Sequence, residues 1–172
     1  MDAVQAASDL TLSVLVVGAI VSDFLYMKIS NRLIFLGLGI APAFRLMGEG
    51  MAGIVHYLVN IIFPVFLFYF IYLLGVMGAG DIKLFSVIGG FVNFKELVFC
   101  MCISFVIGAV FSMGKLLKNR NWEVSLFAGA EYFKDLLRGK RYTYDRNRMG
   151  KKNLIHFSLA IGISLLLVKG GM

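Results

Sequence analysis

The sequence predicts an all-α membrane protein with six transmembrane helices, both termini outside, and an amphipathic cytoplasmic segment between the fifth and sixth helices. Three observations lead to this fold class. Of 172 residues, 59% are hydrophobic and only 16% are charged, whereas soluble domains average about 25% charged residues. The apolar residues gather in runs that approach the roughly 20 residues needed to cross a bilayer. The basic residues fall mostly on one side of the topology that these runs define.

Six apolar runs are the candidate spans. The third and fifth are long enough for a full span, whereas the second, fourth and sixth are short. No Lys or Arg precedes the first run, so we expect it to be retained as a helix and not cleaved as a signal peptide. The runs are Leu10–Met27, Leu33–Met47, Ile54–Val76, Ile82–Val92, Leu97–Gly114 and Leu154–Val168.

The basic residues decide between six spans and five, because the fourth and fifth runs are separated only by residues 93–96. If the turn with Lys28 and Arg32 is cytoplasmic, six spans put 14 of the 17 Lys and Arg on the cytoplasmic side. Merging the two runs would move eleven of these outside, against the positive-inside rule. The sequence therefore favours six spans within a single domain, residues 1–172.

One long polar segment, residues 115–153, carries eleven basic and four acidic residues. Apolar residues recur at helical spacing between Leu126 and Leu137, which predicts an amphipathic helix. We expect this helix to lie on the anionic inner leaflet, and a substrate-docking arm is the alternative. The net charge of +7 then reports topology, so nucleic-acid binding is not expected.

Two carboxylates lie in or beside the apolar runs, where an ionisable side chain is costly and marks a functional site. Asp23 is about one turn from the end of the first run, and Asp81 immediately precedes the fourth. With six spans, both are expected near the cytoplasmic interface at a similar depth. Two adjacent carboxylates share a proton, so that one acts as a base towards water and the other as an acid. The pair predicts an aspartic peptidase, with the base unassigned.

The residues around Asp81 favour a site that admits a substrate. Gly78 and Gly80 remove side chains, so that a substrate backbone or the first helix can come close. The alternative is a simple loop in which Asp81 caps the fourth helix. Lys83 is expected to reach the inner interface and fix the depth of that helix.

Other polar and small residues have structural interpretations. Ser30 and Asn31 are expected to cap the second helix. Gly89, Gly90 and Gly108 are expected to allow close helix packing. The two cysteines and two histidines lack the spacing of metal ligands, so neither a metal nor another cofactor is expected.

The stretch Gly78-Ala79-Gly80-Asp81-Ile82-Lys83-Leu84 resembles the Gly-x-Gly-Asp-x-Lys-Leu motif of bacterial type IV prepilin peptidases. Asp23, followed by Lys28-Ile29-Ser30-Asn31, is similar to their first motif, an Asp followed by a basic residue and Ile-Pro-Asn. Ser30 stands where that motif has Pro, and His156 stands where the family often has Pro. The resemblance extends over nearly the whole chain.

The resemblance implies a membrane aspartic endopeptidase that removes the basic leader of prepilin-like proteins at the cytoplasmic face of the inner (plasma) membrane. Cleavage would follow a Gly, just before the apolar helix of the substrate. Asp23 and Asp81 would be catalytic, supported by the motif residues Gly78, Gly80, Lys83 and Asn31. The chain looks like the short, peptidase-only kind found with tight-adherence (Tad) pili, for which N-methylation is not expected.

Two other functions stay open. A proton- or cation-coupled transporter predicts acids near the midplane and broken helices in repeated halves, whereas both acids here are expected near one face and no repeat is visible. A non-catalytic assembly factor for a pilus or secretion system would not need two intact acids. The particular substrate and the oligomeric state are not set by the sequence.

Overall fold

The computed structural model describes residues 2–73, 77–118 and 157–171, and within these residues all regular structure is helical. Each described helix corresponds to one of the six expected runs, which confirms the all-α prediction. The amphipathic helix expected between Leu126 and Leu137 lies outside the described residues. The helices are α1 (Asp2–Tyr26), α2 (Asn31–Glu49), α3 (Met51–Leu73), α4 (Ala79–Phe91), α5 (Phe94–Lys118) and α7 (Phe157–Gly170).

Three of these helices are long and apolar enough to cross a membrane, namely Ala3–Tyr26, Met51–Leu73 and Phe94–Gly114. Their outer faces carry large apolar side chains that the protein leaves uncovered. Leu25 in α1 is 69% exposed and Phe66 in α3 is 84% exposed. Apolar surface of this extent is typical of a face that another apolar phase covers, which supports a membrane protein.

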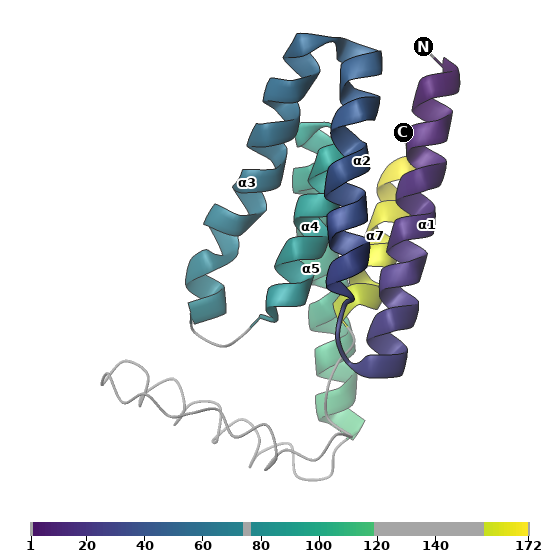
Figure 1. The fold of residues 1–172 in the computed structure, drawn as a ribbon. Helices are drawn as coiled ribbons and strands as arrows, with labels where there is room; N and C mark the ends of the chain where they lie inside the picture. Colours follow the sequence, from purple (N-terminus) through teal and green to yellow (C-terminus); the bar gives the residue numbers. More distant parts are fainter. Residues whose placement is uncertain (1, 74–76, 119–156, 172) are drawn as a thin grey trace. The chain divides into compact units, whose positions relative to one another are not determined.

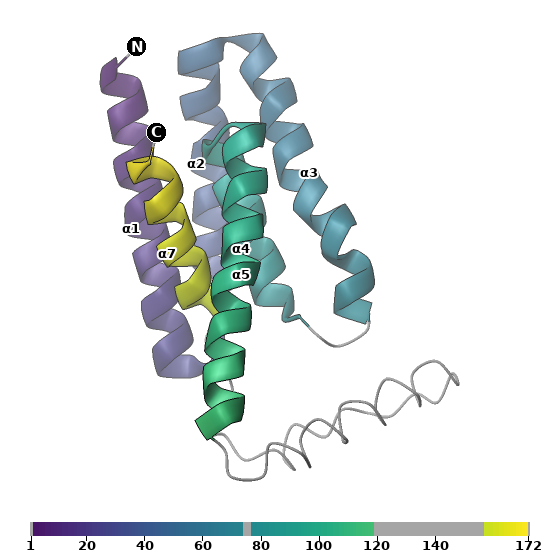
Figure 2. The same ribbon diagram turned by 180° about the vertical axis from the view of Figure 1, so that it is seen from behind.

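The chain divides into two compact units, residues 1–105 with 156–172, and residues 106–155. Residues 106–118, the described part of the second unit, continue α5 as a helix. In the first unit α4 is central, because it contacts α1, α2, α3 and α7 (Figures 1 and 2). Every residue of α4 from Leu84 to Phe91 is buried. Contacts with four neighbouring helices bury this helix, which at 13 residues is shorter than a bilayer is thick.

Two glycines allow this central position, as expected. A Cβ on Gly89 would lie 2.5 Å from the backbone oxygen of Asn60 in α3, and one on Gly90 would lie 2.9 Å from Cβ of Ala41 in α2. Backbones can approach this closely only where the side chain is a hydrogen atom. The sequence Gly-Gly therefore sets the contact of α4 with both neighbours.

Gly89→Ala is expected to lower the free energy of unfolding by about 1–3 kcal/mol, the usual cost of overpacking, because the Asn60 carbonyl is backbone and cannot rotate away. Gly39→Ala is the matched control, since nothing lies within 4 Å of a Cβ there and alanine favours a helix. Unfolding of both variants in detergent micelles measures the difference. Equal stability would contradict the close approach of α3 and α4.

The two ends of the chain lie at the same end of the bundle. Lys169 Nζ in the last turn of α7 donates a 2.8 Å hydrogen bond to Asp9 Oδ1 in α1. α1 itself begins at Asp2, eight residues before the expected run, so the polar stretch before Leu10 is helical as well. The prediction that the first helix starts at Leu10 is wrong, because it relied on hydropathy alone and that stretch has no Pro or Gly to stop a helix.

Candidate active site

Asp23 lies in the last turn of α1, just before the chain reverses. Met27 N–H donates a 2.8 Å hydrogen bond to the Asp23 carbonyl, and Met27 then takes a φ of 54°. This left-handed conformation is unusual for a residue other than glycine and turns the chain towards α2. Ser22 Oγ stabilises the turn by donating to the Lys28 carbonyl at 2.9 Å. The Asp23 side chain is partly buried.

Asp81 lies in the first turn of α4, at its third residue. Gly78 occupies the N-cap position, and Asp81 N–H donates to the Gly78 carbonyl at 3.2 Å. Asp81 is therefore not the N-cap residue, but its carboxyl at the third helical position interacts with the Gly78 backbone as in a capping box, so the capping alternative stays open. Gly78 has an ordinary φ of −75°, so its glycine is explained by space, since a Cβ there would lie 3.2 Å from Asp81 Oδ2. A Cβ on Gly80 would only touch Ile29, at 3.5 Å.

The two carboxyl groups interact electrostatically. Burial, and after it the negative charge of Asp23, raise the pKa of Asp81 from 3.8 to about 7, against a smaller opposing effect of the hydrogen bond with Gly78. Asp81 lies in the first turn of α4, outside the three helices that are long and apolar enough to cross a membrane. The Asp81 carboxyl consequently keeps its proton at pH values where an aspartate is normally ionised.

Lys83 and Asn31 join the beginning of α4 to the beginning of α2. Lys83 Nζ donates a 3.1 Å hydrogen bond to Asn31 Oδ1, and both side chains are exposed. Ser30 occupies the N-cap position of α2, as expected, but it makes no side-chain cap bond. Asn31 is the first residue of α2, and its side-chain oxygen accepts from Lys83. The sequence preference of asparagine suggested a helix cap, but the Asn31 side chain bonds to Lys83 in another helix instead.

These residues all lie at one end of the bundle, where α1 ends and α2, α4 and α7 begin (Figure 1). A model of the type IV leader peptidase family matches residues 10–113, more than half of the chain, including both acids. The chain belongs to this family. It is therefore a prepilin-type peptidase at the level of the family, and so a hydrolase. No match was found among curated proteins or among solved structures.

The peptidase brings one further side chain to Asp23 that the sequence did not reveal. Ser158, the second residue of α7, donates a 2.6 Å hydrogen bond from Oγ to Asp23 Oδ2. Ser158 is fully buried and lies outside the residues matched by the family model. A serine inside an apolar run is common, so no sequence signal could have found this contact.

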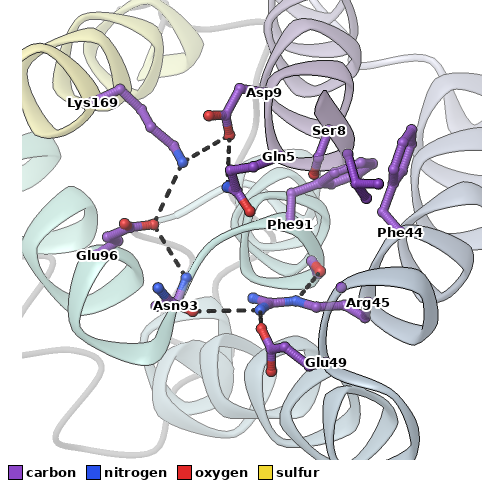
Figure 3. A pocket seen from close by; sticks show the side chains of 13 residues that line it. Gln5, Ser8, Asp9, Phe44, Arg45, Glu49, Phe91, Asn93, Glu96 and Lys169 are labelled. Carbon is purple, nitrogen blue, oxygen red and sulfur yellow. Dashed lines mark hydrogen bonds and ion pairs between the residues drawn. The ribbon is translucent and has the colours of Figure 1, made fainter. Parts of the chain in front are cut away.

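A pocket of about 460 Å³ lies at the other end of the same helices, among the beginning of α1, the ends of α2, α4 and α7, and the beginning of α5 (Figure 3). Arg45 donates to the carbonyls of Gly90 and Val92 and pairs with Glu49. Lys169 lies within 3.6 Å of Glu96. These charges bind one another and the α4 terminus, so the pocket is a structural junction apart from the acids.

Proposed function

We propose that this chain is a membrane aspartic endopeptidase that removes the leader of prepilin-like proteins, with Asp23 and Asp81 as its catalytic pair. The observation that carries the proposal is the electrostatic interaction of these two carboxyls, from α1 and α4, in a member of the leader peptidase family. One carboxyl that keeps its proton beside another that is charged is the arrangement that acid–base hydrolysis of a peptide bond needs.

In the proposed reaction the ionised carboxylate takes a proton from water while the water oxygen attacks the scissile carbonyl carbon. The protonated carboxyl donates its proton to the carbonyl oxygen, which gives a tetrahedral diol. Collapse of the diol breaks the C–N bond, and the leaving nitrogen takes the proton that the first carboxylate gained. One diol hydroxyl returns a proton to the second carboxylate, which restores the starting state of the pair. The products are a leader with a new carboxyl terminus and a mature protein with a new amino terminus.

We further propose six spans, both termini outside, and a site at the cytoplasmic face of the inner membrane. The basic residues of 115–153 support this orientation through the positive-inside rule, and the Lys169–Asp9 pair supports an even number of spans. Gly78 and Gly80 would let an extended substrate approach Asp81, while the Asn31–Lys83 bond holds α2 and α4 together there. A chain of this kind would serve a Tad-type pilus as a peptidase.

The test is co-expression with a tagged prepilin-like protein that has a basic leader, a Gly at the junction and an apolar helix after it. Mass spectrometry of the product identifies its amino terminus. We expect cleavage after the Gly with the wild type and none with the Asp23→Asn, Asp81→Asn double variant. Equal trimming by the double variant would overturn the two-carboxylate mechanism. Proton flux into liposomes without any cleavage would instead favour a transporter.

A further inference from the structure

The hydroxyl of Ser158 bonds to a side chain of another helix. Ser86 and Ser104 donate to the carbonyls of Ile82 and Cys100, four residues earlier in their own helices, whereas Ser158 is only the second residue of α7. Ser158 instead crosses from α7 to α1 and donates to the Asp23 carboxyl. The contact joins residues 135 positions apart, so tertiary packing alone creates it.

The Ser158 hydroxyl lies close to the Asp23 carboxyl. The two oxygens are 2.6 Å apart, within the usual range of O–H···O bonds. A hydrogen bond donated to a carboxylate favours its ionised form, and complete burial of Ser158 keeps water from replacing the donor.

The described groups at this end of α1, α4 and α7 make the site asymmetric. α1 packs against α2, α4 and α7. From α4 comes Asp81, which burial keeps protonated, and Lys83, which is bonded to Asn31. Lys28 and Arg32, which flank the turn into α2, are exposed. α7 contributes the Ser158 hydroxyl, which does not titrate.

We propose that Ser158 is a positioning residue that holds Asp23 as the ionised member of the pair. Asp23 is then the base that activates water, and Asp81 begins the reaction as the acid. This inference rests on the proposed function and adds to it an assignment of the two roles and a part for α7. Ser158 acts through Asp23 and does not touch the reacting bond.

The experiment compares Ser158→Ala with the wild type across the pH range, using the full chain reconstituted in vesicles with a prepilin-like substrate. Without the donor, the base is protonated more easily. The acidic limb of the pH–activity profile, where activity falls because the base takes up a proton, should therefore move to higher pH. We expect that limb of the kcat profile to move upward by about one to two pH units. KM should stay within about twofold.

Two variants separate this role from general packing. Ser158→Thr keeps the hydroxyl and should restore the wild-type limb. Ser164→Ala removes another buried serine of α7, one bonded to Cys100 and Ser104, and should leave the limb in place whatever its effect on stability. An unmoved limb in Ser158→Ala, or an equal movement in Ser164→Ala, would overturn the inference.

These outcomes are distinct from failure of the proposed function. If Asp23→Asn is inactive while Ser158→Ala keeps the wild-type profile, the peptidase mechanism stands and only the role of Ser158 falls. If the wild type trims no leader, or Asp23→Asn trims at the normal rate, the proposed function itself fails and the role of Ser158 fails with it.

Discussion

Asp81→Asn and Asp23→Asn should each lower kcat for leader cleavage by about 10²–10⁴-fold, the range that general acid–base groups contribute. Asparagine keeps the shape of aspartate but can neither accept the proton from water nor deliver one to the leaving nitrogen. Because the two carboxyls act as a unit, the double variant should be little worse than either single variant. Initial rates of trimming, normalised to folded protein, measure the effect.

The matched control is Asp9→Asn, which removes a carboxylate of the same helix at the end away from the site, where it pairs with Lys169. It should keep wild-type kcat. If the Asp9 variant loses as much activity as the Asp23 variant, the loss reflects damage to α1 and the catalytic assignment is unsupported. A single variant at Asp23 or Asp81 with normal trimming would remove that residue from the mechanism.

Asp81→Asn should also change how stability depends on pH, and this result separates loss of chemistry from loss of fold. The pKa of Asp81 is raised to about 7 in the folded protein, so folding favours its protonated form and stability is lost as pH rises through 7. Asparagine has no proton to lose. The variant should therefore gain thermal stability relative to the wild type at pH 8, and the gain should vanish near pH 4.

Arg45→Met should produce the largest loss of stability, about 3–5 kcal/mol in the free energy of unfolding, as expected when one partner of a buried charged network is removed. Arg45 is only 7% exposed. Its Nε donates to the Gly90 carbonyl at 3.1 Å, and a second nitrogen donates to Val92. These carbonyls belong to the end of α4, where no further turn satisfies them and a cation is favoured.

Lys95→Met tests the specificity of this effect, because Lys95 is an exposed cation at the beginning of α5. Such surface changes alter stability by about 0.5 kcal/mol or less. Arg45→Lys should fall between the two, since it keeps the charge but lacks the planar fork that reaches two carbonyls. Unfolding in detergent micelles ranks the three variants, and equal loss for Arg45→Met and Lys95→Met would contradict the role given to Arg45.

Arg45 also explains an exception in the charge pattern. The sequence placed it among the few basic residues outside the cytoplasmic side, where the positive-inside rule offers no reason for a cation. The structure supplies the reason, because Arg45 bonds to the end of α4 together with Asn60, which donates to Val92 at 2.9 Å. One end of α4 is thus held by α2 and α3, while Asp81 lies at the other.

The sequence by itself determined where the described helices lie along the chain, which two acids stand beside apolar runs, and the family. Apolar runs and the Gly-x-Gly-Asp motif are local patterns, so they can be recognised without knowledge of the fold. The boundaries it misplaced, such as the beginning of α1, are positions where hydropathy and helix propensity differ.

Only the tertiary structure decided which polar groups meet. The Ser158–Asp23, Arg45–Gly90 and Lys83–Asn31 bonds join residues 135, 45 and 52 positions apart. Each of these side chains could instead bond to groups nearby in the sequence, and asparagine, as at position 31, is a residue that commonly caps helices. The partner is set by how helices pack around α4. The buried Ser158 and Arg45 need a partner, because leaving a buried polar group unpaired costs about 1–3 kcal/mol.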